Sequence, residues 1–219
     1  FDELNQHYSF GKHIHHVGPI VQIDDGDATA IAKTRADVAA QLDHPFEKLV
    51  VSMLGGGVAA DRGPQLQTIC AALARRPDVL HLVVVWPNAK IAPELMLWPN
   101  THVVHSLNAL KLARAADFVI SAVGYNSFHE ILYHQIPSIL IPQTAPYMDD
   151  QERRARAAVD RGLADIILPE ELLQLRRTLD RFLETDRTTM LREQIKSTPL
   201  PSAGNAMAAR IVAEGSHHA

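Results

Sequence analysis

Short valine-rich apolar runs alternate with segments of helical spacing along most of this chain. Each run is continuously apolar, and glycine or proline bounds several of them. Continuous runs of this length are typical of strands that are buried on both faces of a sheet. Such strands are predicted at Lys48–Leu54, Leu80–Trp86, Thr101–Val104, Asp117–Ala122, Ser138–Pro142 and Ala164–Leu168.

Segments with helical spacing separate these strands. A parallel connection needs a crossover long enough for a helix, so the alternation predicts an α/β fold with a Rossmann-like, doubly wound parallel sheet of about six strands. Ligands of such sheets bind beyond the carboxyl ends of the strands, which makes the loops there the candidate site. Helices are predicted at Ala28–Leu42, Gly63–Arg75, Leu107–Ala115, Ser127–His134, Asp149–Arg161, Glu170–Glu184 and Ala203–Ala213.

The overall charge is small and negative, since 25 acidic residues outnumber 21 lysines and arginines and give a formal net charge of -4. A chain of this charge has no broad basic field, so no nucleic-acid partner is expected and any bound phosphate should be met by local groups. The single cysteine, Cys70, rules out an internal disulfide framework and is typical of a reducing compartment, so the cytoplasm is the expected location.

The two ends of the chain indicate a domain that follows another one. The chain begins with Phe1 instead of Met, which suggests a piece of something longer. Residues 1–22 are predicted to be a linker from a missing N-terminal domain, residues 23–214 to form the ligand-binding domain, and residues 215–219 to be a disordered tail or tag remnant. The cluster of His13, His15 and His16 in this linker has no matching carboxylate or thiolate nearby to complete a ligand set, so no metal site is expected.

Three glycines, Gly55, Gly56 and Gly57, follow the first predicted strand. Glycines at this place let the backbone adopt positive φ or come close to a ligand. The dinucleotide pattern G-x-G-x-x-G is not matched, because Val58 and Ala59 follow, and the chain has no P-loop sequence. The loop is either a ligand-binding turn or a tight turn without a ligand.

The segment Ser121–Glu130, SAVGYNSFHE, follows the fourth strand and opens a helix. Gly124 permits the turn, while Asn126 and Ser127 place an amide and a hydroxyl at the expected cap, beside first-turn N–H groups that suit a diphosphate. Glu130 lies one turn further on, where its carboxylate could accept hydrogen bonds from two ribose hydroxyls. The alternative is a capping box, in which Glu130 reaches back to the helix start.

A loop punctuated by proline, Pro142–Ala157, follows the fifth strand and leads into a helix that begins with acidic and amide residues. Asp149, Asp150, Gln151 and Glu152 either complement the helix dipole or offer acceptors to sugar hydroxyls. Both interpretations remain open on spacing alone.

The order of a glycine-rich loop, ADFVISAVGYNSFHEIL, a strand ending in proline and then DDQ resembles the C-terminal domain of GT-B glycosyltransferases. It is most similar to the branch with the bacterial lipid-linked N-acetylglucosaminyltransferase of peptidoglycan synthesis, macrolide glycosyltransferases and plant UDP-glycosyltransferases. The resemblance covers nearly the whole chain. It implies the donor-binding half of an enzyme that transfers a sugar from a nucleoside-diphosphate sugar, with UDP or dTDP, to an acceptor hydroxyl, without a metal or other cofactor.

The resemblance also implies a role for each matching residue, with no catalytic residue in this chain. Departures from the plant pattern are Ser121, where many plant members carry a histidine before the glycine, and Tyr125, where they carry tryptophan. The implied contacts are diphosphate at Gly55, Gly56, Gly57, Ser121, Gly124, Tyr125, Asn126 and Ser127, ribose at Glu130, base at His105, Ser106 and Leu107, and sugar at Asp150 and Gln151.

The implied partner is an N-terminal acceptor-binding domain or a separate partner subunit, which would supply the catalytic base and any peripheral membrane association. Two other functions fit the same fold: a nucleotide-sugar epimerase or hydrolase, and a noncatalytic nucleotide-sugar-binding subunit. A dinucleotide-dependent oxidoreductase is disfavoured because its glycine fingerprint is missing.

Overall fold

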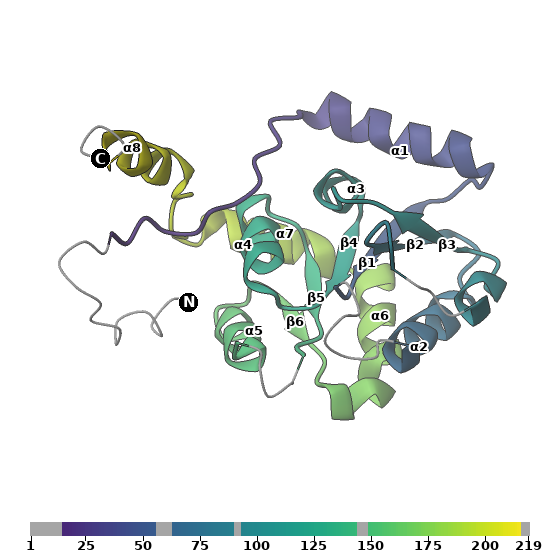
Figure 1. The fold of residues 1–219 in the computed structure, drawn as a ribbon. Helices are drawn as coiled ribbons and strands as arrows, with labels where there is room; N and C mark the ends of the chain where they lie inside the picture. The colour runs from purple at the N-terminus through teal and green to yellow at the C-terminus, as the bar shows by residue number, and fades with distance from the viewer. Residues whose placement is uncertain (1–14, 56–62, 90–92, 144–148, 216–219) are drawn as a thin grey trace.

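The strands form a single parallel sheet in the computed structural model, which describes residues 15–55, 63–89, 93–143 and 149–215 (Figure 1). The strand order is β3-β2-β1-β4-β5-β6, and each neighbouring pair is parallel. The elements are α1 (Ala28–Leu42), β1 (Lys48–Met53), α2 (Gly63–Leu73), β2 (Val79–Val85), η2 (Pro93–Leu97), β3 (Thr101–His105), α3 (Leu110–Ala115), β4 (Phe118–Ser121), α4 (Tyr125–Tyr133), β5 (Ser138–Leu140), α5 (Gln151–Val159), β6 (Asp165–Ile166), η3 (Pro169–Gln174), α6 (Leu175–Glu184), α7 (Arg187–Ser197) and α8 (Asn205–Gly215).

This order confirms the predicted doubly wound, Rossmann-like α/β fold. The chain builds outward from β1 to β3, crosses back to β4, and then builds outward in the other direction. From the neighbouring strands β1 and β4 the chain therefore continues toward opposite edges of the sheet. Sheets of this kind bind ligands in the crevice at the carboxyl ends of such a pair of strands. One expectation was wrong in part: β3 is not buried on both faces, because it is the edge strand and its three central residues are only half-buried.

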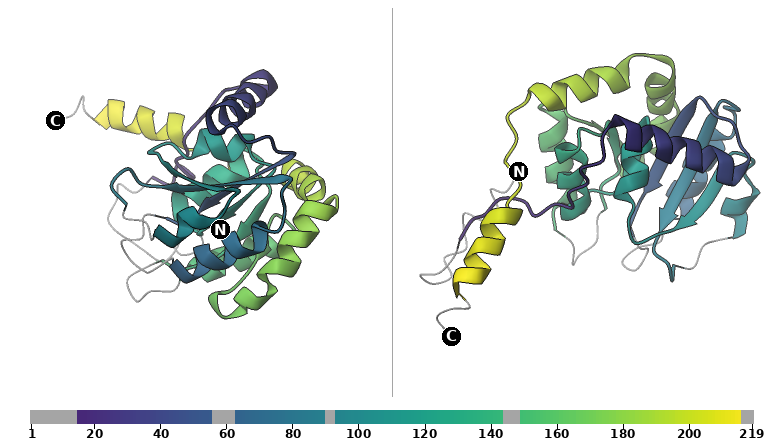
Figure 2. Two further views of the ribbon diagram at one scale, coloured as in Figure 1. Left: turned by 90° about the vertical axis from the view of Figure 1, so that its right-hand side faces the viewer. Right: turned by 90° about the horizontal axis from the view of Figure 1, so that it is seen from above.

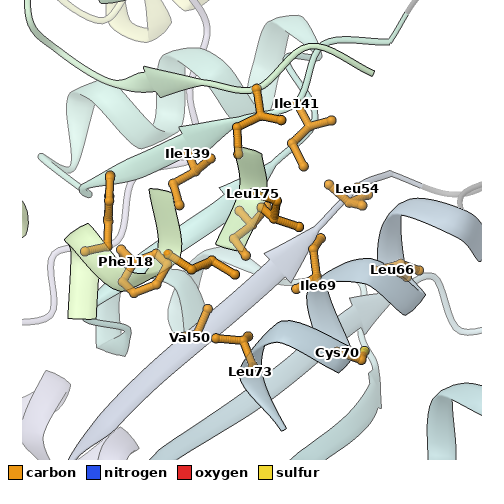
Figure 3. Packing of buried hydrophobic residues seen from close by; sticks show 14 of the residues in the cluster. Val50, Leu54, Leu66, Ile69, Cys70, Leu73, Phe118, Ile139, Ile141 and Leu175 are labelled. Carbon is orange, nitrogen blue, oxygen red and sulfur yellow. The ribbon is translucent and has the colours of Figure 1, made fainter. Parts of the chain in front are cut away.

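Helices cover both faces of the sheet. On one face, Val50 and Phe118 from the central strands pack against Leu73 of α2 and Leu175 of α6 (Figure 3). The ring of Phe118 lies 4.9 Å, centroid to centroid, from that of Phe182 in α6. The alternate strand residues point to the other face, where α1, α3 and α4 contribute to a second core cluster. The two clusters fix the sheet, so that the loops at its carboxyl edge project from a rigid base.

Two helical regions differ from the sequence-based expectation. The predicted helix Glu170–Glu184 is divided into a short 3-10 helix, η3, and the α-helix α6, and Glu171 inside η3 has non-helical dihedral angles of φ -102 and ψ 16. The helix α7 was not predicted. Only Leu191 and Ile195 are buried in it, so its apolar face is too narrow to stand out in a polar sequence.

A buried histidine joins three neighbouring strands, β1, β2 and β3, on the α2 side. His81 of β2 is fully buried, with Nε2 at 2.7 Å from the hydroxyl of Ser52 and Nδ1 at 3.1 Å from that of Thr101. Burial lowers the pKa of His81 from 6.5 to about 3. The imidazole is therefore neutral inside the fold, since no negative charge offsets its desolvation.

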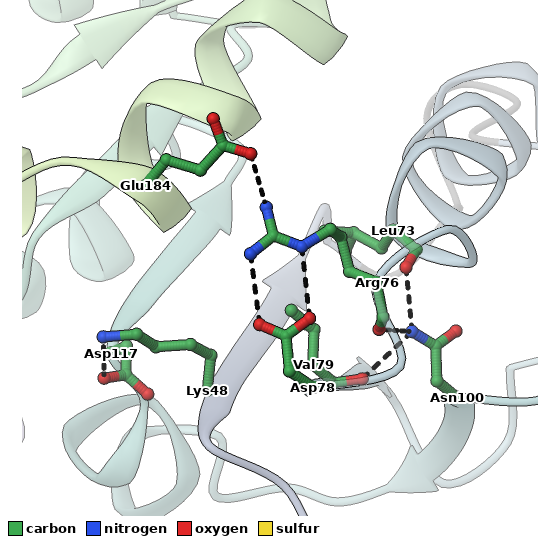
Figure 4. A network of polar contacts seen from close by, with 8 residues as sticks. All are labelled: Lys48, Leu73, Arg76, Asp78, Val79, Asn100, Asp117 and Glu184. Atoms are coloured by element: carbon green, nitrogen blue, oxygen red, sulfur yellow. Dashed lines mark hydrogen bonds and ion pairs between the residues drawn. The ribbon is translucent and has the colours of Figure 1, made fainter.

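A network of polar contacts lies at the amino edge of the sheet (Figure 4). The buried Asn100 amide lies within hydrogen-bond distance of the carbonyls of Leu73, Arg76 and Val79, at 2.9, 3.1 and 3.0 Å. These carbonyls lie where α2 ends and β2 begins. One side chain thus donates to the backbone of this whole turn, in which Leu73 and Arg76 also accept hydrogen bonds from backbone N–H groups.

Charged residues around this turn pair with one another. The guanidinium of Arg76 makes ion pairs with Asp78 at 3.1 Å and with Glu184 of α6 at 3.0 Å. Hydrogen bonding to Arg76 holds the pKa of Asp78 below its usual value. Lys48, the first residue of β1, makes an ion pair of 3.6 Å with Asp117, which directly precedes β4 (Figure 4).

The segment that enters the domain runs beside the segment that leaves it. Val21 exchanges two hydrogen bonds with the side chain of Asn205, at 3.1 and 2.8 Å, and Pro19 accepts one from Gly204 at 2.8 Å. Beyond this contact α8 projects away from the sheet (Figure 2). Within the described ranges, no helix combines the length and the apolar character needed to cross a bilayer.

Candidate functional site

A cavity of about 570 Å³ lies at the carboxyl edge of the sheet. It extends from the loop after β3 to the loop after β5, and α3 and α4 contribute to its wall. It therefore includes the crevice between β1 and β4 where the fold favours a ligand. Its lining is Gln22, Met53, Gly55, Val84, Val85, Trp86, Ser106, Leu107, Ala109, Leu110, Ala113, Ala122, Gly124, Asn126, Ser127, Glu130, Ile131, Ile136, Gln143 and Gln151.

Two glycines line this cavity for different reasons. Gly55 has φ +86, which favours glycine over residues with a side chain. Gly124 has φ -59, so its conformation does not need glycine and the expectation that it permits the turn was wrong. A Cβ built on Gly124 meets no atom within 4 Å of the described structure. The absence of a side chain there keeps space open for a ligand beside the start of α4.

The helix α4 begins two residues earlier than predicted. Gly124 is its N-cap and makes no side-chain cap hydrogen bond, which places Asn126 and Ser127 inside the first turn and not at the cap. The first N–H groups of a helix have no acceptor one turn back and carry partial positive charge. Asn126 is exposed, Ser127 is half-buried, and both line the cavity. The cavity therefore contains an anion-favouring end.

Glu130 lies in the wall of the cavity, one turn beyond Ser127. Its Oε1 accepts a hydrogen bond of 3.1 Å from the backbone N–H of Gln22, in the segment that precedes α1. With Gly124 as the cap, Glu130 lies too far along α4 to form the predicted capping box. Its carboxylate instead connects the cavity wall to the entering segment.

The opposite end of the cavity is largely apolar. Trp86, directly after β2, is 60% exposed, and Leu107, after β3, is 76% exposed, although both side chains are large and hydrophobic. Val84, Val85 and Ala109 extend this wall. An exposed apolar surface that includes an indole ring suits a planar heterocycle.

The other two residues predicted to contact a base support the loop after β3. The backbone N–H of Ser106 donates to Val85 at 2.9 Å, and its hydroxyl contacts the backbone of Asn108. His105 is exposed, and its Nδ1 lies 3.2 Å from the carbonyl of Trp86. His105 is outside the lining of the cavity, whereas Ser106 and Leu107 are part of it.

The predicted sugar residues differ in their surroundings. Gln151 is buried, and its Oε1 accepts hydrogen bonds from the backbone N–H groups of Val123 at 3.2 Å and Gln143 at 3.0 Å. Asp150 caps α5 through a hydrogen bond of 3.0 Å from the backbone N–H of Arg153. Gln151 lines the cavity and Asp150 does not. Gln151 thus joins the loops after β4 and β5.

The remaining predicted residues lie outside the lining or outside the described chain. Ser121 is fully buried, and its hydroxyl donates to the carbonyl of Ala122 at 2.8 Å. The ring of Tyr125 packs against His129 at 4.4 Å and beneath the guanidinium of Arg154 at 5.4 Å. Gly56 and Gly57 fall among residues 56–62, which the structure does not describe.

Twelve of the lining residues were not identified from the sequence, and three of these, Trp86, Gln22 and Gln143, have aromatic or amide side chains. Trp86 had been assigned to the end of a strand, and Gln22 to a linker. Gln143 follows β5, and its Nε2 donates to the carbonyl of Leu54 at 2.6 Å, beside Gly55. The position of Trp86 and Gln143 just after buried strands was the available signal. Nothing local indicated Gln22.

The described part of the lining contains no lysine or arginine. Backbone N–H groups and neutral side chains are therefore the available donors for an anion along these residues. In the same described ranges, no three His, Cys, Asp or Glu residues gather into a group that could hold a metal ion.

Comparison with known proteins identifies a family. Residues 95–206, about half of the chain, match the family described as glycosyltransferase family 28 C-terminal domain. A Bacillus cereus protein, UDP-N-acetylglucosamine--N-acetylmuramyl-(pentapeptide) pyrophosphoryl-undecaprenol N-acetylglucosamine transferase 1, is 30% identical over 101 residues. That alignment covers 45% of this chain and 28% of the relative.

Solved structures show the same fold at low identity. Os79 from O. sativa has a TM-score of 0.60 and 17% identity, over 86% of this chain and 47% of that one. The spinosyn rhamnosyltransferase SpnG, complexed with thymidine diphosphate, has a TM-score of 0.57 and 19% identity, over 78% and 47%. The chain thus spans less than half the length of these proteins and resembles one half of a GT-B fold.

Proposed function

The chain belongs to the glycosyltransferase family 28 C-terminal domain family, and from this premise we propose that it is the donor-binding half of a glycosyltransferase. The donor is a nucleoside-diphosphate sugar, and the acceptor is a hydroxyl group held by another domain or subunit. One observation carries the proposal: a single cavity joins the first turn of α4, the carboxylate of Glu130 and an apolar wall. These three surfaces match the diphosphate, ribose and base of such a donor.

The order of the strands sets the order of the proposed subsites. Along the carboxyl edge, the loop after β3 comes first, followed by the ends of β2, β1, β4 and β5. The base lies against Ser106 and Leu107, the ribose at Glu130, and the diphosphate at Gly124 and Ser127. The sugar then lies beyond β4, near Gln151. An extended ligand fits this order without folding back on itself.

The diphosphate is the leaving group of the proposed reaction. Negative charge that builds on it is stabilised by the first-turn N–H groups of α4 and by the hydroxyl of Ser127. This role needs donors fixed in place before the reaction, and the N-terminus of a packed helix provides them. We assign no catalytic base to this chain, and we expect donor binding to be independent of a metal ion.

Uridine and thymidine are the two bases to test. The Bacillus cereus relative is named for a UDP sugar, and a spinosyn rhamnosyltransferase structure contains thymidine diphosphate. Ribose carries two vicinal hydroxyls for Glu130, whereas the deoxyribose of thymidine diphosphate carries one. A Glu130 contact to both hydroxyls would therefore favour the uridine nucleotide.

The test is a calorimetric titration of the 219-residue chain with UDP and thymidine diphosphate, in the presence of EDTA. We expect at least one nucleotide to bind, and the chain alone to transfer no sugar from the matching donor. Ser127→Ala should weaken binding about three- to ten-fold, as the loss of one hydrogen bond predicts. Ser197→Ala, on α7 and outside the lining of the cavity, is the matched control. Loss of binding on chelation, or robust transfer by the chain alone, would overturn the proposal.

A further inference from the structure

Two side chains hold the backbone of Gln22: Glu130 of α4, and His134, the C-cap residue of that helix. The Gln22 N–H donates to Oε1 of Glu130 at 3.1 Å, and its carbonyl lies 2.9 Å from Nε2 of His134. A carbonyl only accepts hydrogen bonds, so Nε2 of His134 is the donor. Glu130 and His134 are one helical turn apart and share a face of α4. In Figure 1, the segment before α1 runs past α4 at this point.

The next residues of this segment are fastened by α3. Arg114 donates to the carbonyls of Asp24 and Gly26, at 2.6 and 2.5 Å, and pairs with the Asp24 carboxylate at 3.0 Å. The backbone N–H of Gly26 and then the guanidinium of Arg114 hold the pKa of Asp24 below its usual value. The segment 22–26 is thus tied to α3 and α4, the two helices that contribute to the cavity wall.

Gln22 also lines the cavity, beside Glu130. A glutamate side chain on a half-exposed helix face has several rotamers available, and fixing one of them costs conformational entropy. A hydrogen bond from Gln22 to Oε1 fixes the carboxylate before the ligand arrives, so less entropy is lost on binding. Each carboxylate oxygen has two acceptor sites, so Glu130 keeps acceptors for a ligand.

We propose that His134 is a positioning residue for the nucleotide: it holds the Gln22 backbone so that the Gln22 N–H orients the Glu130 carboxylate toward the ribose hydroxyls. This inference rests on the proposed function, because it requires a ribose at Glu130. His134 does not touch the ligand. Its effect on binding passes through Gln22 and then Glu130.

The surroundings of these contacts favour a role in binding over one in stability. Gln22 is exposed and His134 is half-buried, so their hydrogen bonds compete with water. Such bonds contribute little to the free energy of unfolding. Because these hydrogen bonds lie beside the cavity, we expect them to affect the affinity for the ligand more than the stability of the fold.

The test is a double-mutant cycle on UDP affinity in the 219-residue chain. His134→Ala should weaken UDP binding about three- to ten-fold in the wild-type background, and should have no further effect in a Glu130→Ala background. His134→Gln should restore most of the affinity, because its amide can donate to the same carbonyl. A UDP analogue that lacks both ribose hydroxyls should bind equally well to the chain with and without His134→Ala.

A matched control separates this effect from loosening of the segment in general. Asp27→Ala removes the N-cap of α1, where Asp27 accepts a hydrogen bond of 3.0 Å from Ala30, and it leaves the Gln22 contacts in place. We expect it to lower thermal stability without changing UDP affinity.

Several results would overturn the inference. An equal loss of UDP affinity on His134→Ala in the wild-type and Glu130→Ala backgrounds would show that His134 acts independently of Glu130. Equal losses for UDP and for the analogue would show that the ribose is not involved. An unchanged affinity in His134→Ala would contradict the inference alone, whereas failure of the wild-type chain to bind UDP or thymidine diphosphate would contradict the proposed function and the inference together.

Discussion

The two edges of the sheet use polar residues in opposite ways. At the amino edge, Asn100 satisfies three carbonyls, and Arg76 pairs with two carboxylates (Figure 4). At the carboxyl edge, Gly124 leaves space open beside a helix start, while Trp86 and Leu107 remain exposed. The same strands connect both edges. The side-chain contacts of the amino edge join elements of the protein and stabilise the fold, whereas the open surface of the carboxyl edge is available to a ligand.

Gln151 shows that the division between these edges is not absolute. It lines the cavity, yet its carbonyl oxygen is used by two backbone N–H groups. The carboxyl edge is therefore an open surface held in shape by a few buried polar side chains. Substitutions at the two edges should separate stability from binding, and Gln151 should affect both.

The largest expected effect is on stability at the amino edge. Asn100→Ala removes a buried amide that donates to the carbonyls of Leu73, Arg76 and Val79, so the free energy of unfolding should fall by about 3 kcal/mol, at about 1 kcal/mol for each hydrogen bond. Denaturant unfolding measures the loss, and the UDP affinity of the folded protein should change by less than about two-fold, or about 0.4 kcal/mol. Asn88→Ala, at an exposed residue near the carboxyl edge, is the control. A large loss of UDP affinity in Asn100→Ala would contradict the assignment of the amino edge to stability alone.

Glu130→Ala should have the largest effect on binding. The loss of a charge-assisted hydrogen bond to the ribose should weaken UDP by about 1.5–3 kcal/mol and leave pyrophosphate nearly unchanged. Calorimetry with the two ligands measures the difference, and the melting temperature should change little. Equal weakening of UDP and pyrophosphate would place Glu130 at the phosphates or in a structural role.

Gln151→Ala should reduce stability and binding together. Two buried N–H groups lose their acceptor, which should cost about 1–2 kcal/mol of unfolding free energy. Because Val123 and Gln143 belong to the loops after β4 and β5, UDP and the UDP sugar should both weaken. A loss confined to the sugar would instead support direct sugar recognition through its amide nitrogen.

The interior between the edges should make the protein sensitive to acid. The pKa of His81 is lowered in the fold from 6.5 to about 3, so the contribution of its neutral imidazole to stability is fully present above pH 6.5. As pH falls below 6.5 the unfolded chain binds a proton that the folded chain does not, and stability is lost at about 1.4 kcal/mol per pH unit until about pH 3. Denaturant unfolding between pH 7 and 5 measures the slope, which His81→Asn should reduce. An unchanged slope in that variant would exclude His81 as its source.

The smallest expected effect is at Trp86. Trp86→Ala removes an exposed aromatic surface from the cavity wall and should weaken UDP by about 1 kcal/mol, with pyrophosphate unaffected. Leu97→Ala, at a side chain that is 79% exposed and outside the lining, is the control. Equal weakening of UDP and pyrophosphate in Trp86→Ala would place the base elsewhere.

The fold was predictable because its signals are local. Valine-rich runs mark buried strands, and the helix α1 was predicted at its observed bounds, where Asp27 provides a cap. The helix α7 was missed since it buries only Leu191 and Ile195. Burial on a narrow face depends on neighbours that are distant in the sequence.

The site was predictable only in part. Ser127 and Glu130 belong to one sequence pattern and do line one cavity. The contact of Gln22 with Glu130 joins residues 108 positions apart, and the local pattern around Gln22 carries no sign of it. The orientation of Gln151 likewise depends on two loops that meet only in the folded chain. Side-chain direction, more than residue type, is what the sequence left open.

The most direct test of the central claim is to map where a nucleotide changes the backbone. Amide NMR spectra of the isotope-labelled chain should be recorded during a titration with UDP. UDP should shift the signals of Gly55, Ser106 and Gly124 at the carboxyl edge and leave those of Asp78 and Asn100 at the amino edge unchanged. Shifts centred on the amino edge, or spectra that UDP leaves unchanged throughout, would contradict the assignment of this cavity as the donor site.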